Sequence, residues 1–65
     1  MNLYIADERL LAIAKRMRVL AEPVGPMHGL WESIFDIEAL VAEKPTLLTR
    51  EQIIIDALRW EAKHP

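Results

Sequence analysis

The pattern of apolar positions divides the chain into three segments with helical spacing. In the first segment, residues 7–21, apolar side chains recur every three or four residues, which places them on one face of a helix. Asp7 stands where its carboxylate can cap the first turn, and Pro23 predicts the end of the helix. The apolar face comprises Leu10, Ile13, Ala14, Met17, Leu20 and Ala21.

The second segment, residues 30–44, has a wider apolar arc and is followed by Pro45. Trp31 and Phe35 extend the arc on one side of the main stripe, and Leu40 extends it on the other. A helix that packs on a single neighbour needs a narrower apolar face than this. The main stripe comprises Leu30, Ile34, Ile37 and Val41.

The third segment, residues 50–63, begins with a specific local signal. Thr49 and Gln52 have the spacing of a capping box, in which each side chain satisfies a backbone amide of the other residue. Leu48 and Ile53 have the spacing of a hydrophobic staple. The apolar positions that follow form adjacent stripes, and together these stripes are too wide for a single neighbouring helix to cover. The stripes are Ile53, Ala57 and Trp60; Ile54 and Leu58; and Ile55.

These segments predict one all-α domain over residues 1–65, with three helices in an orthogonal or bundle-like arrangement. Residues 3–5 can form a short extended arm before the first helix. The proline- and glycine-containing stretch 23–29 is interpreted as a stiff helix connection with Met27 packed inward. His28 is expected to start the second helix or to form a local hydrogen bond.

Length and composition point to an oligomer, most simply a dimer. A chain this short buries only about 60% of its unfolded surface, yet 52% of its residues are hydrophobic. It has no cysteine, so disulfides cannot stabilise it. The wide apolar arcs predict an interface with a partner or a second copy. The residues expected there are Trp31, Phe35, Glu38, Ile54, Leu58 and Trp60.

Glu38 lies within the apolar arc of the second segment, where a carboxylate must be paired, protonated or extended to water. We expect Arg16 or Arg18 of the first helix to form an ion pair with it. Glu61 is a similar case on the third helix, although near the chain end it can reach water.

The sequence shows none of the residue patterns typical of an enzyme. It has no serine–histidine–acid set, no glycine-rich nucleotide loop and no paired carboxylates. His28 and Glu32 are four residues apart, but Gly29 lies between them and no third metal ligand is evident. We therefore expect a non-enzymatic protein without catalytic, cofactor-binding or metal-binding residues.

Charge and hydropathy restrict the partners and the compartment. A net charge of −2 argues against non-specific binding to nucleic acid. No apolar stretch approaches the roughly 20 residues of a membrane span. The charges of residues 7–9 come too early for a secretory signal, so we expect a cytoplasmic protein without membrane contact.

Two stretches resemble ribbon-helix-helix DNA-binding proteins, which include many antitoxins. Residues 1–7 are similar to that family's short strand and helix cap, and residues 49–58 to its second helix. The resemblance implies that Asn2 and Tyr4 face the major groove and that Thr49 and Arg50 approach phosphates. Here, however, a whole amphipathic segment separates the two helices.

Two hypotheses follow. The first is a self-associating protein that acts by binding a protein partner, as a regulator, inhibitor or assembly factor. The second is a dimeric DNA-binding repressor or antitoxin of ribbon-helix-helix-like type. Its nucleic-acid contacts would be Arg9, Lys15, Arg16, Arg18 and Arg50.

Overall fold

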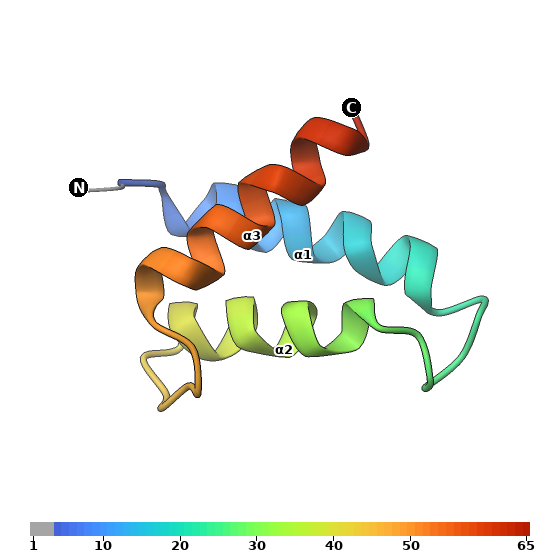
Figure 1. Ribbon diagram of the computed structural model, residues 1–65, viewed down its shortest axis with the longest axis horizontal. Helices are drawn as coiled ribbons and strands as arrows, with labels where there is room; N and C mark the ends of the chain where they lie inside the picture. The colour runs from blue at the N-terminus through green and yellow to red at the C-terminus, as the bar shows by residue number, and fades with distance from the viewer. Residues whose placement is uncertain (1–3) are drawn as a thin grey trace.

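The computed structural model describes residues 4–65 and confirms the all-α prediction. Its helices are α1 (Asp7–Ala21), α2 (Leu30–Val41) and α3 (Arg50–Lys63). Helices α1 and α2 run antiparallel side by side, and α3 crosses over them on one side (Figure 1). Within residues 4–65, no helix has both the length and the apolar character needed to cross a membrane.

All three helices contribute to one core, together with Ile5. The apolar face predicted for α1 is buried except at Leu20, which is 45% exposed. Leu20 is exposed because it lines an open hollow with Trp60 where α1 and α3 separate. The buried core residues are Ile5, Leu10, Ile13, Ala14, Met17, Ala21, Ile34, Ile37, Ile53, Ile54 and Ala57.

Helix α1 begins differently from the prediction. The N-cap residue is Ala6, which makes no side-chain cap, and Asp7 is the first helical residue instead of the cap. Ile5 and Leu10 occupy the two positions of a hydrophobic staple, and both are buried in the core. Burial of Ile5 thus directs the chain into the helix. Tyr4 and Ile5 form no strand, and Leu3 lies outside the described residues.

Helix α2 ends at Val41, so its predicted extension to residue 44 is wrong. Glu43 has a φ of 59°, in the left-handed region. The Lys44 amide donates to the Ala39 carbonyl (2.8 Å), and the Glu43 amide donates to the Leu40 carbonyl (3.1 Å). These two bonds form a Schellman motif, which ends the helix before Pro45 is reached.

Helix α3 begins as predicted, but only half of the capping box is present. The Gln52 amide donates to Thr49 Oγ1 at 3.2 Å, so Thr49 is the N-cap. The Gln52 side chain turns forward and donates to Asp56 Oδ1 at 2.9 Å. The side-chain amide of Gln52 is therefore bonded to Asp56, whereas a full capping box would direct the Gln52 side chain back to the Thr49 backbone.

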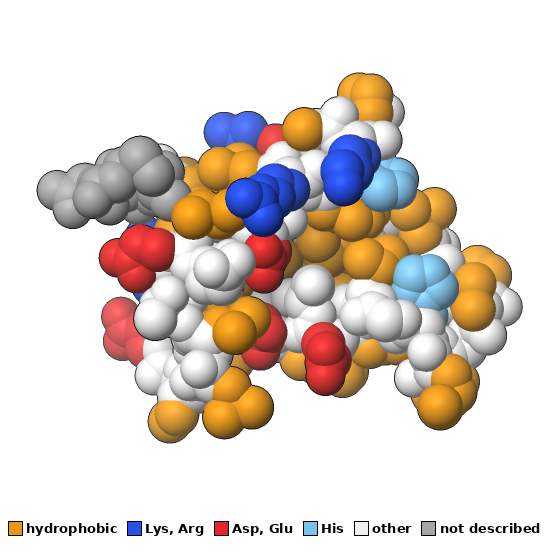
Figure 2. All heavy atoms as spheres, in the orientation of Figure 1, with side chains coloured by type: hydrophobic (Ala, Val, Ile, Leu, Met, Phe, Trp, Pro, Cys, Tyr) orange, Lys and Arg blue, Asp and Glu red, His pale blue; other side chains and the backbone are white. Residues whose placement is uncertain are grey.

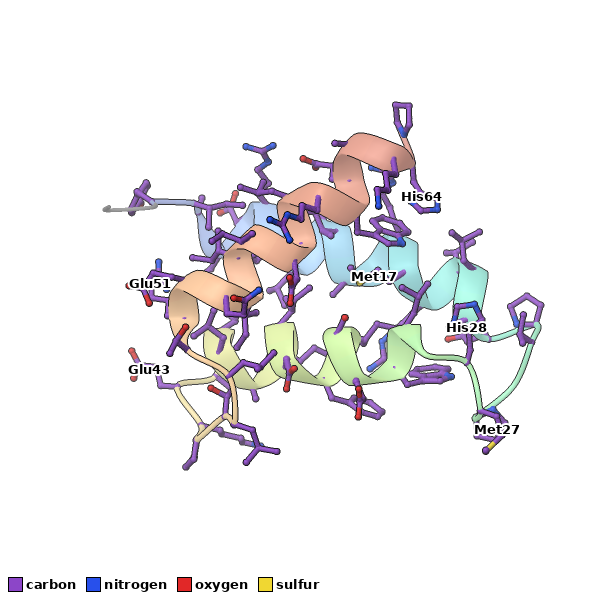
Figure 3. All side chains as sticks on the ribbon, viewed as in Figure 1. Met17, Met27, His28, Glu43, Glu51 and His64 are labelled. Carbon is purple, nitrogen blue, oxygen red and sulfur yellow. The ribbon has the colours of Figure 1, made fainter. Side chains whose placement is uncertain are left out.

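The connection between α1 and α2 contradicts one expectation and confirms another. Met27 is 94% exposed and points away from the helices (Figure 3), so its predicted inward packing is wrong. His28 Nδ1 accepts from the Leu30 amide at 3.1 Å, so His28 does bond locally at the start of α2. Gly25, with a φ of 106°, turns the chain before Met27.

Candidate protein-binding surface

Helix α1 has two flanks that contact different helices. On one flank, Arg9 pairs with Glu61 (Nη2 to Oε1, 2.6 Å), and Arg16 donates to the His64 carbonyl. On the other flank, Arg18 reaches α2. Successive helical residues are rotated by about 100°, so Arg16 and Arg18 point to nearly opposite sides. Helix α3 therefore contacts one flank of α1, and α2 contacts the other.

Helix α2 is divided in the same way. Ser33 and Asp36 line a small hollow together with side chains of α3. The opposite flank carries the residues that meet Arg18 and is turned away from α3. We define the α1–α2 face as five residues on this side of the molecule: Leu11, Arg18, Trp31, Phe35 and Glu38.

An ion pair and two aromatic rings organise the α1–α2 face. Arg18 Nη2 donates to both carboxylate oxygens of Glu38 at 2.8 Å, and Arg18 Nε lies 3.3 Å from Oε2. This confirms the ion pair expected for Glu38 and selects Arg18 as its partner. The Arg18 guanidinium also lies over the Trp31 ring, 5.4 Å from the ring centre, at a distance typical of a cation–π contact.

Trp31 is fixed from three directions. Its indole Nε1 donates to the Gly25 carbonyl at 2.9 Å, which joins the ring to the α1–α2 connection. Arg18 covers the ring, and the Phe35 ring stacks on it with 5.7 Å between centres. Trp31 is half-buried against the core, whereas Phe35 is 56% exposed. The face therefore presents an exposed ring on a rigid base.

Phe35 stands between two surface hollows. One is lined by Trp31, Phe35, Gly25, Pro26 and Glu22. The other is lined by Phe35, Leu47, Leu48, Glu32 and Asp36. Apolar side chains thus extend on both sides of Phe35, and the charged residues lining the two hollows are carboxylates.

A second apolar surface lies where α1 and α3 separate. Trp60 stacks on His64 with 4.4 Å between ring centres, and Arg16 lies over the Trp60 ring at 5.5 Å. Val19, Leu20 and Pro65 complete the lining of this hollow. Figure 2 shows apolar side chains gathered beside the end of α3, between the two histidines.

The structure brings together only part of the predicted interface. Trp31, Phe35 and Glu38 share the α1–α2 face, whereas Trp60 belongs to the second surface. The expectation for Ile54 is wrong: it is fully buried in the core, and Leu58 is partly buried against it. The crossing of α3 over both other helices buries two adjacent stripes where an isolated helix pair would bury one.

Sequence reasoning missed Leu11 as a surface residue. Leu11 is exposed and precedes Arg18 by seven residues, or about two helical turns. That spacing places Leu11 on the same side of α1 as Arg18, and the pairing of Arg18 with α2 shows which side of the molecule this is. Leu11 extends the face along α1 from the ion pair toward the start of the helix.

The cations expected to contact nucleic acid are spread over the molecule. Arg9 and Arg16 contact α3, and Arg18 pairs with α2. Lys15 and Arg50 are exposed. For the ribbon-helix-helix alternative, no strand occurs in residues 4–65, and Asn2 lies outside them. DNA binding stays an untested prediction.

Among residues 4–65, no group of three or more histidine or acidic side chains is placed to hold a metal ion. Comparison of the chain with protein-family models, curated proteins and solved structures finds no match.

Proposed function

We propose that this chain is a non-enzymatic helical protein that forms a homodimer through the α1–α2 face and acts by binding a protein partner. The observation that carries the proposal is the exposed Phe35 ring on the fixed Trp31 ring. The dimer formed through this surface would act as a regulator, inhibitor or assembly factor, whose activity is recognition of another protein.

Residue types and rigidity both support this proposal. Tryptophan and arginine are enriched among the residues that dominate binding energy at protein interfaces. Arg18 and Trp31 already hold each other in place, and Gly25 holds the indole. Association would therefore order few additional side chains, which lowers its entropic cost.

The α1–α2 face differs from the interface that the apolar pattern of the third helix predicts. Ile54 is buried and Leu58 is partly buried within the monomer, so these two side chains offer little contact area to a partner. Phe35 and Leu11 remain exposed on the α1–α2 face. Covering such a face with a symmetry mate would enlarge a core that is small at this chain length.

The test is the molar mass of the protein in solution, measured by light scattering after size exclusion over a range of concentrations. We expect the wild type to form a dimer and Phe35→Asp to be a monomer. Leu20→Asp is the matched control, because Leu20 is exposed to a similar degree but belongs to the second surface.

Circular dichroism should show the same helix content for both variants. A wild type that stays monomeric at high micromolar concentration contradicts self-association. A dimer broken by Leu20→Asp but not by Phe35→Asp would instead assign the interface to the hollow beside Trp60.

A further inference from the structure

We infer that the hollow where α1 and α3 separate binds an acidic segment of the partner protein. An apolar side chain of that segment fills the hollow, and its carboxylates accept hydrogen bonds from Arg16 and Trp60. The inference rests on the proposed function, because a chain that dimerises through the α1–α2 face leaves the opposite flank of α1 for its partner.

The walls of the hollow are mostly apolar. Val19 and Leu20 are exposed and line the hollow from the last turns of α1, and Trp60 and Pro65 line it from the end of α3. An aromatic or branched aliphatic side chain that enters the hollow displaces water from these residues, and the hydrophobic effect then favours binding.

Trp60 offers a hydrogen-bond donor that Trp31 does not. The indole Nε1 of Trp31 donates to the Gly25 carbonyl, whereas Nε1 of Trp60 has no hydrogen-bond partner within residues 4–65. In that part of the chain no buried side-chain nitrogen lacks a partner, so Nε1 of Trp60 is accessible to solvent. An indole N–H can only donate, and it therefore selects an acceptor such as a carboxylate.

Arg16 supplies further donors beside the same ring. Its guanidinium lies 5.5 Å from the centre of the Trp60 ring, and Nη2 donates to the His64 carbonyl. Nε and Nη1 of Arg16 have no hydrogen-bond partner in the described part of the chain. The guanidinium is thus held over the indole, while Nη1 is free to donate to a carboxylate in a charge-assisted hydrogen bond.

Cations without ion-pair partners border the hollow. Lys15 precedes Val19 by about one helical turn, and Arg59 and Lys63 lie about one turn apart on the stripe of α3 next to that of Trp60. These three cations are exposed, and none of them forms an ion pair within residues 4–65. The border of the hollow is therefore complementary to negative charge.

Acidic side chains do not neutralise this surface. None of the described acidic side chains lines the hollow, and Glu61, which follows Trp60, is paired with Arg9. Figure 2 shows lysine and arginine side chains of α3 beside the apolar area, and acidic side chains farther away, over α2 and the first half of α3. The local charge thus contrasts with the net charge of −2 of the whole chain.

The same features disfavour other occupants. A second copy related by a twofold axis would place two cationic surfaces against each other. Duplex DNA would meet the cations with its phosphates but would leave the apolar hollow unfilled. An anionic membrane takes up protruding apolar side chains, whereas those of the hollow are recessed between two helices. A protein segment with an apolar residue among aspartates or glutamates matches both the hollow and its border.

The test selects peptides from a phage-displayed library of random sequences on the immobilised wild-type protein. We expect the selected sequences to combine an apolar residue with flanking aspartates or glutamates. One selected peptide is synthesised, and calorimetry measures its Kd. In the ¹H–¹⁵N spectrum this peptide should shift the indole resonance of Trp60 and leave that of Trp31 in place. A selection that yields no peptide, or peptides without acidic residues, overturns the inference.

Charge reversal tests the border of the hollow. Arg59→Glu/Lys63→Glu should weaken binding of the selected peptide by at least about tenfold at low salt, because two attractive charges become repulsive. Arg50→Glu is the matched control, since Arg50 is exposed at the other end of α3 and its reversal should change Kd by less than about twofold. Circular dichroism checks that both variants keep their helix content. Equal Kd values for the wild type and both variants contradict recognition by charge.

The outcome is separable from the dimerisation test. Because the hollow belongs to one chain, the monomeric Phe35→Asp variant should bind the selected peptide as the wild type does. Leu20→Asp should lose the peptide and remain a dimer. A wild type that binds the peptide as a monomer overturns the dimer but not this inference. If Leu20→Asp breaks the dimer, the hollow is occupied by a second copy and the inference is wrong.

Two further probes are duplex DNA and vesicles containing phosphatidylserine. We expect neither to compete with the selected peptide. Competition by DNA or by the vesicles, lost in Arg59→Glu/Lys63→Glu, would assign the surface to that ligand and overturn its assignment to a protein.

Discussion

The two connections between helices, residues 22–29 and 42–49, have the same length but turn the chain in different ways. The first turns at Gly25, where a φ of 106° suits a residue without Cβ. The second turns at Glu43, where a φ of 59° is unfavourable for a side chain. The residue at the turn of the first connection therefore suits its backbone conformation better than the residue at the turn of the second.

The connections also differ in how they are fastened to the fold. The Gly25 carbonyl accepts the Trp31 indole N–H, so the first connection is joined to the α1–α2 face. The second is held by the backbone bonds of the Schellman motif and by the Thr49 cap. A change in the first should thus affect both stability and binding, whereas a change in the second should affect stability alone.

The largest expected effect is at Gly25. Gly25→Ala should lower the free energy of unfolding by about 2 kcal/mol, because alanine is strained at this backbone angle. No atom lies within 4 Å of the added Cβ, so the cost is one of backbone conformation. Chemical denaturation measures it. Gly29→Ala, at an ordinary φ of −63°, should stay within about 0.5 kcal/mol of wild type; equal losses at both glycines would contradict this reading.

Trp31→Phe should lower the free energy of unfolding by about 1 to 2 kcal/mol. The variant keeps a ring but loses the indole hydrogen bond, which leaves the Gly25 carbonyl with the His28 amide (3.2 Å) as its remaining donor. It should also weaken the dimer in light scattering. Trp60→Phe is the control at the second surface, and we expect it to leave dimerisation unchanged. If Trp31→Phe still formed stable dimers, the first connection would not contribute to dimerisation.

Thr49→Ala should lower the free energy of unfolding by about 1 kcal/mol, the usual cost of removing an N-cap side chain. Thr49→Ser retains the hydroxyl and should preserve most of that stability. Dimerisation should not change in either variant. An unchanged thermal midpoint for Thr49→Ala would show that the hydroxyl contributes nothing to the start of α3.

The smallest expected effect has the opposite sign. Glu43→Gly should raise the free energy of unfolding by about 0.5 kcal/mol, because glycine relieves the left-handed backbone but gains freedom in the unfolded chain. Ala42→Gly, beside it at a φ of −81°, gains no such relief and should destabilise the protein. Destabilisation by Glu43→Gly would mean that the Glu43 side chain compensates for its strain.

Local signals in the sequence determined the start of each helix to within a residue. Thr49 caps α3 because its hydroxyl and the Gln52 amide are only three residues apart. The end of α2 was predicted too late because the prediction relied on Pro45. The left-handed residue that ends the helix is Glu43, and without a glycine there the sequence gives no signal of the turn. The helical periods of α1 and α2 likewise predicted most of the core.

Only the tertiary structure decided which apolar residues are available to a partner. Ile54 and Phe35 both lie on wide apolar arcs, yet Ile54 is fully buried and Phe35 is largely exposed. The periodicity of one helix fixes relative directions around its own axis, but burial depends on where the other helices cross it. The choice of Arg18 over Arg16 as the partner of Glu38 has the same origin, because α3 occupies one flank of α1 and leaves the other to α2.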